Sequence, residues 1–430
     1  MFEKINLLIP FGNFFRNKST QNFLFLVFIQ SSTVLISIIS MPLLIQSIGA
    51  EQFGLVNLAL SVIIILNIWV GFGYNLSAPA EVALKQSDKK ELSQLLSNIL
   101  SAKLLLATLA SATVLVGAYV FSLFQGYQAI LLLSLLLLFS DALFPLWFFQ
   151  GMEKMKLVSV ATIFSKLLFL MGLVLFVHHP SQSIWVNFML GMFGIIVNIG
   201  LLGYIRAGMG IRFYKPKFFS IWKSLKENIL LFFSNLVSYI SIHGGLIILS
   251  FFATAETLGM YSLAERVVMI LRLLPAMIIQ AVVPNASKLF QADQALFFAF
   301  LKKVYLISLG VGAILSTSCF LAAPYIIQIL SRNQLGEALP YLELLSLVPF
   351  LACLNVGNVT MLLVSNLRDL LFRASWMFCT YMIVASTLLT RAYGAIGLCY
   401  GILTTELVVF LISMLLLFRY KKDLLYGLYS

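Results

Sequence analysis

Charged residues are scarce in this chain. Only 10% of its 430 residues are Asp, Glu, Lys or Arg, whereas 61% are hydrophobic. An ordinary soluble domain carries about 25% charged residues, so the composition excludes a water-soluble globular protein. The apolar runs are long enough for helices, which need about 20 residues to cross the hydrocarbon core, and they lack the alternation of barrel strands. The sequence therefore predicts an all-α integral membrane protein.

Residues suited to catalysis and metal binding are also few. The chain has four cysteines and three histidines. It has no GxxxxGK[ST] loop and no Ser/His/Asp set in its short loops. The four cysteines all fall within or at the ends of predicted apolar spans, which disfavours disulfides and metal-ligand clusters; they are Cys319, Cys353, Cys379 and Cys399. We therefore expect no enzymatic activity, no metal and no cofactor.

Polar or Gly/Pro-containing turns divide the apolar sequence into twelve spans. They cover roughly residues 23–47, 54–75, 98–123, 128–149, 157–177, 184–205, 228–252, 260–283, 301–322, 339–364, 373–390 and 394–418. Residues 1–22, basic and aromatic without a cleavage site, are predicted to be an uncleaved cytoplasmic interfacial segment. Residues 419–430 are predicted to be a cytoplasmic tail.

Basic residues are distributed unevenly over the connections between these spans. Most of the 28 Lys and Arg lie in the terminal segments and the even-numbered connections. Because cytoplasmic loops carry the excess of Lys and Arg, both termini are predicted to be cytoplasmic. The net charge of +12 then reflects topology and contact with membrane lipids, and a nucleic-acid partner is not expected.

A segment of thirteen residues occurs twice. Residues 50–62 recur as residues 255–267, and the identical positions include Gly54/Gly259. The offset spans six helices, so the two copies enter the membrane in the same direction. This predicts two parallel six-helix repeats, residues 23–205 and 228–418, around a central cavity with the substrate site near the midplane. A basic amphipathic cytoplasmic linker is predicted over residues 206–227, although a plain solvated connector fits as well.

The eighth span carries three charges where lipid would surround them. A charge at the bilayer centre costs about 2.5–3.5 kcal/mol, so it needs a partner or a cavity. Arg272 is predicted near the midplane, with Glu265 on nearly the same stripe and Arg266 about a third of a turn away. The repeat aligns Arg266 with Ser61 and Arg272 with Asn67. A duplicated polar stripe facing a shared cavity is one explanation; an internal ion pair for Arg272 is the other.

Other polar residues in the spans allow two interpretations. Gln30 begins a polar face in the first span, and its repeat partner is Asn235 in the seventh; cavity lining and close helix packing explain both equally well. His243, nearby, is either a core residue or a proton relay.

Two charges in the fourth and fifth spans lie at matching predicted depths. Asp141 and Lys166 are therefore expected to form a buried ion pair, or else to act in ion coupling or substrate contact. Lys103 is expected to snorkel to the cytoplasm. Glu406 has no obvious partner in the sequence and is a candidate for ion coupling.

Four motifs occur in an order and spacing that resemble a known family. They are Gly-Ala-Glu-Gln-Phe-Gly (49–54), Gly-Phe-Gly-Tyr-Asn (71–75) leading to Pro-Ala-Glu (79–81), Trp-Phe-Phe-Gln-Gly-Met-Glu-Lys (147–154) and Gly-Met-Tyr-Ser-Leu-Ala-Glu-Arg (259–266). Together they resemble the polysaccharide repeat-unit (O-antigen, Wzx-type) flippases of the multidrug/oligosaccharidyl-lipid/polysaccharide (MOP) exporter superfamily. The resemblance implies a MATE-like fold in a bacterial inner membrane. It also implies alternating-access movement of undecaprenyl-pyrophosphate-linked oligosaccharide to the periplasmic leaflet, coupled to Na⁺ or H⁺.

The resemblance also implies partners and roles for individual residues. A polysaccharide polymerase and a chain-length regulator are the implied protein partners. Arg272, Arg266 and Lys166 would contact the pyrophosphate, because Arg offers it bidentate hydrogen bonds. The remaining predicted substrate-lining residues are Asn67, Ser61, Gln30 and Asn235, and the ion-coupling candidates are Asp141, Glu265, Glu406 and His243.

Two other function classes remain open at this point. A MATE-type drug or cation antiporter would share the duplicated fold, but it would favour an acidic cavity. A membrane O-antigen polymerase, an enzyme, would be expected to present a substantial periplasmic loop. The peptidoglycan-precursor flippases resemble this chain in fold, yet they usually have fourteen helices and basic residues in the first one.

Overall fold

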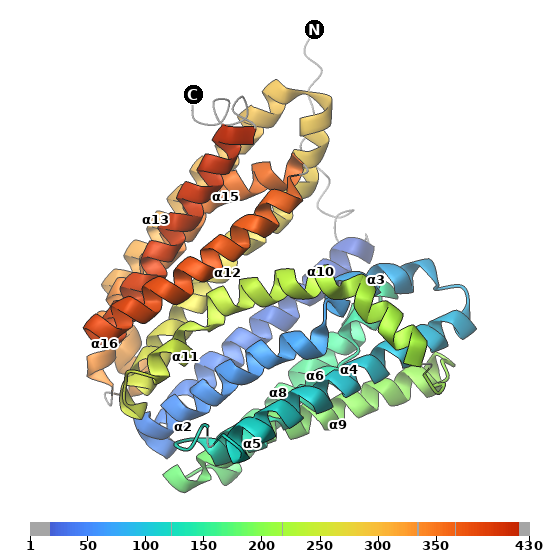
Figure 1. Cartoon of the computed structure of the whole chain (residues 1–430), viewed down its shortest axis with the longest axis horizontal. Coiled ribbons are helices and arrows are strands. Elements are labelled where there is room, and N and C mark those ends of the chain that lie inside the picture. Colours follow the sequence, from blue (N-terminus) through green and yellow to red (C-terminus); the bar gives the residue numbers. More distant parts are fainter. Residues whose placement is uncertain (1–17, 122, 217, 333–334, 366, 421–430) are drawn as a thin grey trace. The chain divides into compact units, whose positions relative to one another are not determined.

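The computed structural model describes residues 18–121, 123–216, 218–332, 335–365 and 367–420, and within these ranges the chain is helical with no strands (Figure 1). The predicted segment 1–22 and tail 419–430 lie mostly outside the described residues. The α-helices are α2 (Lys18–Gly71), α3 (Tyr74–Leu84), α4 (Lys89–Tyr119), α5 (Gln128–Ser134), α6 (Leu136–Leu143), α7 (Leu146–Gly151), α8 (Met155–Phe176), α9 (Ile184–Gly208), α10 (Phe218–His243), α11 (Gly245–Ser250), α12 (Ala255–Ala292), α13 (Gln294–Ser331), α14 (Leu339–Leu345), α15 (Val348–Val364) and α16 (Arg368–Tyr420). Short 3₁₀ turns, η1 (Pro180–Ser183) and η2 (Gly336–Ala338), precede α9 and α14.

Two very long helices each contain two of the predicted spans. The backbone of α2 leaves the helical region only at Gly49 (φ 78°), and that of α16 only at Gly394 (φ 61°). Glycine adopts this left-handed conformation without steric cost, so each chain reversal needs no loop. Over the described residues, nine helical stretches are long and apolar enough to cross a membrane, and two of them are these double spans. The seventh predicted span lies in α10 and α11, which meet at Gly244.

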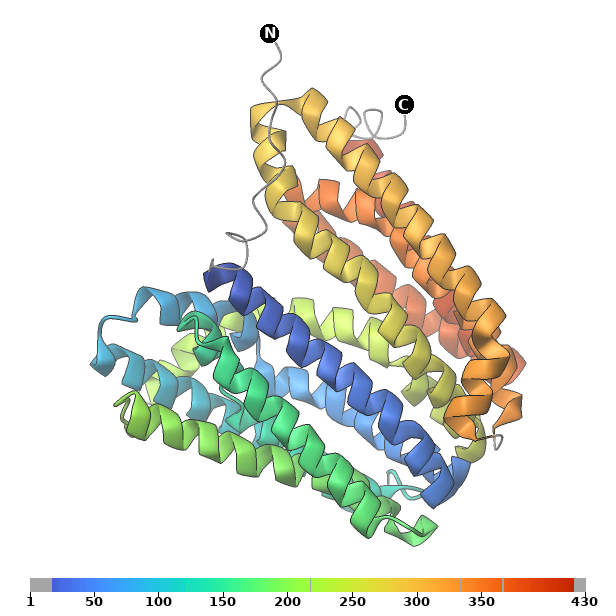
Figure 2. The same cartoon turned by 180° about the vertical axis from the view of Figure 1, so that it is seen from behind.

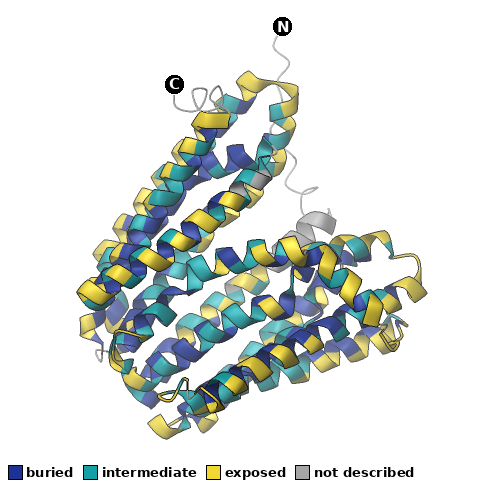
Figure 3. Cartoon of the chain, in the orientation of Figure 1, coloured by how far each residue is buried: buried dark blue, intermediate teal, exposed yellow. Residues whose placement is uncertain are grey.

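The outer face of α8 shows how the helices meet lipid. Exposed apolar residues recur along it at spacings of three and four, which places them on one side of the helix; they are Leu157, Val160, Phe164, Leu167, Met171 and Val174. Figure 3 shows such exposed stripes on the outer sides of several helices. A helix with an exposed apolar stripe suits a hydrocarbon surround, and the chain is a multi-pass membrane protein.

Contacts divide the structure into two compact units. The first unit comprises Met1–Leu43 and Leu66–Asn235, and the second comprises Leu44–Ile65 and Leu236–Ser430. In the first unit α9 packs along both α6 and α8, and α4 packs on α6 (Figure 1 and Figure 2). In the second unit α15 packs against α12, α13 and α16. The division at residues 205 and 228 into two six-helix bundles stays a prediction.

The predicted linker, residues 206–227, includes the end of α9, an extended stretch and the beginning of α10. The backbone N–H of Arg212 donates to Ser93 Oγ (3.0 Å), and that of Tyr214 donates to Ser97 Oγ (2.9 Å). These bonds hold the extended stretch along α4. Exposed aromatic side chains follow one another here: Phe213, Tyr214, Phe218, Phe219 and Trp222. The attachment of this linker to the inner leaflet of the membrane stays a prediction.

The two copies of the repeated segment cross each other inside the second unit. A Cβ added at Gly54 would lie 2.5 Å from Gly259 N and would also collide with Ala255 O. A Cβ added at Gly259 would lie 2.9 Å from Ala50 C and would collide with Ala50 O. The contacts are reciprocal, as expected for segments related by a two-fold axis. The repeat therefore forms a close backbone crossing that only glycine permits at both positions.

Candidate functional site

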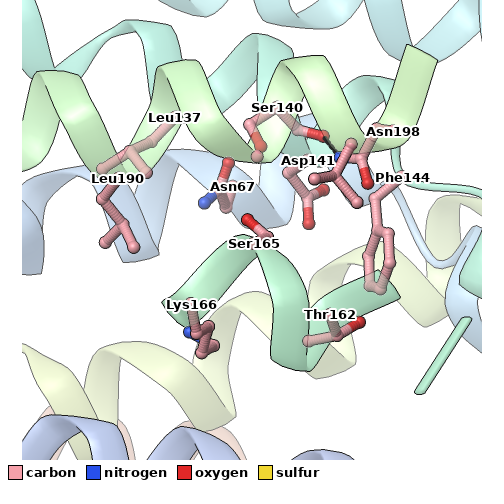
Figure 4. Close-up of a pocket in the computed structure, with 12 residues that line it drawn as sticks. Asn67, Leu137, Ser140, Asp141, Phe144, Thr162, Ser165, Lys166, Leu190 and Asn198 are labelled. Atoms are coloured by element: carbon pink, nitrogen blue, oxygen red, sulfur yellow. Dashed lines mark hydrogen bonds between the residues drawn. The ribbon is translucent and has the colours of Figure 1, made fainter. Parts of the chain in front are cut away.

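The first unit contains a polar pocket of about 230 Å³ (Figure 4). The end of α2, together with α6, α8 and α9, supplies its walls. The polar lining residues are Asn67, Ser140, Asp141, Thr162, Ser165, Lys166 and Asn198, and the apolar ones are Leu137, Phe144, Leu190, Gly194 and Val197. Three of the residues singled out from the sequence, Asn67, Asp141 and Lys166, are thus brought to one pocket.

A buried ion pair lies beside this pocket. Lys103 Nζ is 3.3 Å from Asp141 Oδ2 and donates to the Asp141 backbone carbonyl at 2.7 Å, and the Lys103 side chain is only 1% exposed. The expected snorkelling of Lys103 to the cytoplasm is therefore wrong. The physical reason is that Asp141 offers the ammonium two acceptors, its carboxylate and its backbone carbonyl. The carbonyl also accepts from the Phe144 N–H (3.2 Å), because Pro145 has no N–H to donate. The ammonium donates to that carbonyl and pairs with the carboxylate at the same time.

The predicted pairing of Asp141 with Lys166 is revised accordingly. Both residues line the pocket. The carboxylate, however, is paired with Lys103. Figure 4 shows Asn67, Ser140, Asp141, Ser165 and Lys166 around the pocket that they line.

Close helix packing fixes the polar groups of the pocket. Asn198 Nδ2 donates to the Ser140 carbonyl (2.8 Å), joining α9 to α6. A Cβ added at Gly194 would collide with Ser140 Oγ, so the two helices approach as closely as they can at this level. Asn67 Oδ1 is buried, and the described residues offer it no hydrogen-bond donor. The pocket therefore holds an unsatisfied acceptor among fixed neighbours.

The second unit contains the other charged centre. Arg272 on α12 forms an ion pair with Glu406 on α16; the Arg272 side chain is 25% exposed and that of Glu406 is 6% exposed. The sequence suggested no partner for Glu406, and the structure supplies one. Of the two explanations for Arg272, the internal ion pair is the one observed.

Arg272 also lines a small pocket together with Glu265. This pocket, about 20 Å³, has room for a water-sized group, and its wall includes Tyr261 and Ser241. Tyr261 is fully buried and its hydroxyl donates to Glu265 Oε1 (3.4 Å). The shared stripe predicted for Glu265 and Arg272 is thus observed, and Arg266 is not among the described lining residues.

The remaining predicted site residues lie outside both pockets in the described part of the chain. Ser61 is buried in the second unit, Gln30 is exposed on α2, and Asn235 is half-buried on α10. His243 lies at the end of α10 with its ring 5.6 Å from that of Tyr239. Their predicted roles stay predictions.

Sequence reasoning missed Lys103, Ser140, Asn198 and Tyr261. One signal was available for Lys103: a proline four residues after Asp141 removes the usual helical donor to the Asp141 carbonyl, which leaves room for a side-chain donor. The others have no comparable local signature.

The fold defines the class: this is an all-α, multi-pass membrane protein with the architecture of the MOP superfamily. Solved structures with the same fold include an inward-facing MATE multidrug resistance transporter of that superfamily (TM-score 0.71, 11% identity, covering 93% of this chain and 96% of the other). Another is the lipid II flippase MurJ in an inward closed conformation (TM-score 0.69, 16% identity, covering 94% of this chain and 90% of the other). At sequence identities of 11% and 16%, the structural similarity establishes the fold alone.

Within that class, residues 19–290 match the family described as "Polysaccharide biosynthesis protein", and the chain belongs to this family. A protein of Escherichia coli (strain K12) named as an O-antigen transporter is 24% identical over 419 residues, covering 94% of this chain and 97% of its own length. One of the same name from Shigella dysenteriae is 27% identical over 403 residues, covering 92% and 98%. The family and fold predicted from the four motifs are confirmed.

Proposed function

We propose that this protein moves undecaprenyl-pyrophosphate-linked oligosaccharide repeat units from the cytoplasmic to the periplasmic leaflet of a bacterial inner membrane by alternating access. The family assignment and the names of the relatives support transport of O-antigen or a similar surface polysaccharide. The positive-inside distribution supports cytoplasmic termini. The protein performs no covalent chemistry in this proposal, and a polymerase and a chain-length regulator use its product.

The observation that carries the proposal is the Arg272–Glu406 pair at a pocket in the helix interior. A pyrophosphate offers oxygen pairs that match a guanidinium fork at least as well as a carboxylate does. The lipid headgroup therefore competes with Glu406 for Arg272. This is the anion contact that the family resemblance implied for Arg272, with Glu406 as its competitor.

Exchange of this kind would couple transport to an ion. When the pyrophosphate takes Arg272, Glu406 loses its counter-charge, and an uncompensated buried charge costs about 3–5 kcal/mol. Binding of H⁺ or Na⁺ to Glu406 removes that cost. Since each ligand then favours the other, substrate and ion binding are linked thermodynamically. Glu406 becomes the principal ion-coupling residue of the proposal.

Glu406→Gln tests the coupling. The variant keeps the shape of the side chain and removes its charge, so the headgroup meets no competitor and needs no ion. In vesicles containing the full chain and the lipid-linked repeat unit, wild-type transport should rise severalfold when a proton or sodium gradient is imposed. The variant should show no such rise.

The matched control is Glu337→Gln, on an exposed turn of the same unit. It should respond to the gradient as the wild type does. A Glu406→Gln variant with unchanged gradient dependence would contradict the exchange.

A cation antiporter is the second candidate, because Glu265 also lines the Arg272 pocket and an acidic group suits a cationic substrate. It predicts increased sensitivity to cationic drugs in a deletion strain with intact surface polysaccharide. The flippase proposal predicts the reverse pattern.

A further inference from the structure

We infer that the polar pocket of the first unit is a subsite for one uncharged, hydroxyl-bearing sugar ring of the lipid-linked oligosaccharide. This inference rests on the proposed function and adds the chemistry that recognises the glycan. The lining of the pocket, its charges and its size carry the inference.

The lining offers what a sugar ring needs. Hydroxyls of Ser140, Thr162 and Ser165 and the amides of Asn67 and Asn198 are neutral groups that can both give and receive hydrogen bonds, as sugar hydroxyls do. Apolar side chains complete the wall and suit the C–H surface of a ring; they are Leu137, Phe144, Leu190 and Val197. Apolar walls with a few fixed polar groups are typical of small-molecule sites.

One residue of the lining carries an acceptor without a donor. Asn67 Oδ1 is buried and without a hydrogen-bond donor among the described residues. A buried acceptor without a donor is unfavourable, and a turn of the Asn67 side chain toward the pocket that it lines would let a sugar O–H satisfy it. Asn67 is also the repeat partner of Arg272, so the same position carries a neutral group in one copy and a cation in the other.

The charges disfavour a bare cation as the occupant. Asp141 is the only acidic residue among the described lining residues, and Lys103 lies 3.3 Å from its carboxylate with 1% of its side chain exposed. Lys166 adds a second positive charge to the lining. A metal ion in the pocket would face the Asp141 carboxylate, which Lys103 already neutralises, and would be repelled by the ammonium groups of Lys103 and Lys166. A neutral sugar ring is not repelled by these charges.

The size of the pocket sets how much of the glycan it holds. Its volume of about 230 Å³ lies below the range of about 300–1,000 Å³ that accommodates drug-sized ligands. One ring fits this space and an oligosaccharide does not. The pocket therefore accommodates one sugar ring of the repeat unit.

The test compares two lipids on the full chain in lipid nanodiscs. One is the lipid-linked repeat unit extracted from cells that lack the gene, and the other is undecaprenyl pyrophosphate without sugar. Asn67→Leu should raise the dissociation constant of the glycosylated lipid about tenfold, equivalent to about 1.4 kcal/mol, and leave that of the bare lipid unchanged. Ser165→Ala, which removes one hydroxyl with little change of volume, should act in the same direction.

The control is Asn75→Leu, the same change at an exposed asparagine of the first unit that is not among the described lining residues of the pocket. It should leave both constants unchanged. Equal weakening of both lipids by Asn67→Leu, or no weakening of either, overturns the sugar subsite. If Asn67→Leu abolishes an effect of sodium on lipid binding but leaves the difference in affinity between the two lipids unchanged, the pocket is a cation site instead. If the wild type binds neither lipid, the proposed function itself fails.

Discussion

Gly259→Val should abolish surface polysaccharide when the variant is expressed in a strain lacking the gene. A Cβ at this position would lie 2.9 Å from Ala50 C and collide with Ala50 O, and backbone atoms cannot rotate out of the way. The two helices would have to separate where the repeat copies cross, and forcing extra atoms into a packed contact costs about 1–3 kcal/mol or more. Small residues are what allow membrane helices to approach this closely.

The comparison is made per copy of protein in the membrane, by quantifying polysaccharide and membrane abundance together. Gly310→Val is the matched control, because a Cβ at this membrane-helix glycine meets nothing within 4 Å, and it should complement fully. Gly54→Ala, the milder change on the opposite copy, should reduce polysaccharide per copy as well. Full complementation by Gly259→Val would show that the crossing is dispensable.

Arg272→Ala should also abolish complementation, with membrane abundance intact. The guanidinium is the proposed pyrophosphate contact, and its removal leaves the carboxylate of Glu406 without its partner. Arg272→Lys keeps the charge but loses the bidentate geometry, so transport should fall at least tenfold, an effect of about 1.4 kcal/mol or more. The measurement is the rate of repeat-unit transport in vesicles, alongside surface polysaccharide in cells.

A second variant separates a structural role of Arg272 from a role in binding. Arg272→Ala with Glu406→Ala removes both charges, so the thermal stability lost in the single variant should return while transport should not. Arg391→Ala, at an exposed residue, should behave as the wild type. If the Arg272→Ala variant transports at the wild-type rate, Arg272 is not part of the substrate site.

The fold was predictable because its determinants are local. Continuous apolar runs gave the spans, and the repeat at 205 residues gave the pairing of α2 with α12. The helical joints were not predictable, since Gly49 and Gly394 allow a loop as readily as the sharp reversal within one helix that is observed. The interruption of α6 at Pro145 follows from a residue that the sequence shows plainly.

The candidate site was predictable only along single helices. Helical spacing placed Glu265 and Arg272 at one pocket, and depth placed Asp141 and Lys166 at another. The choice of ion-pair partner depends on how distant helices pack, which periodicity does not encode. For that reason Glu406 had no partner in the sequence, and the sequence offered Lys166 rather than Lys103 as a possible partner of Asp141.

The most direct test of the central claim is the leaflet in which lipid-linked repeat units accumulate when the gene is deleted. Intact and permeabilised spheroplasts are compared for the accessibility of the glycan to a membrane-impermeant oxidant. Transport by this protein predicts single repeat units trapped on the cytoplasmic leaflet, with loss of surface polysaccharide and recovery by the wild-type gene. Accumulation on the periplasmic leaflet would instead indicate a polymerase and would contradict the account.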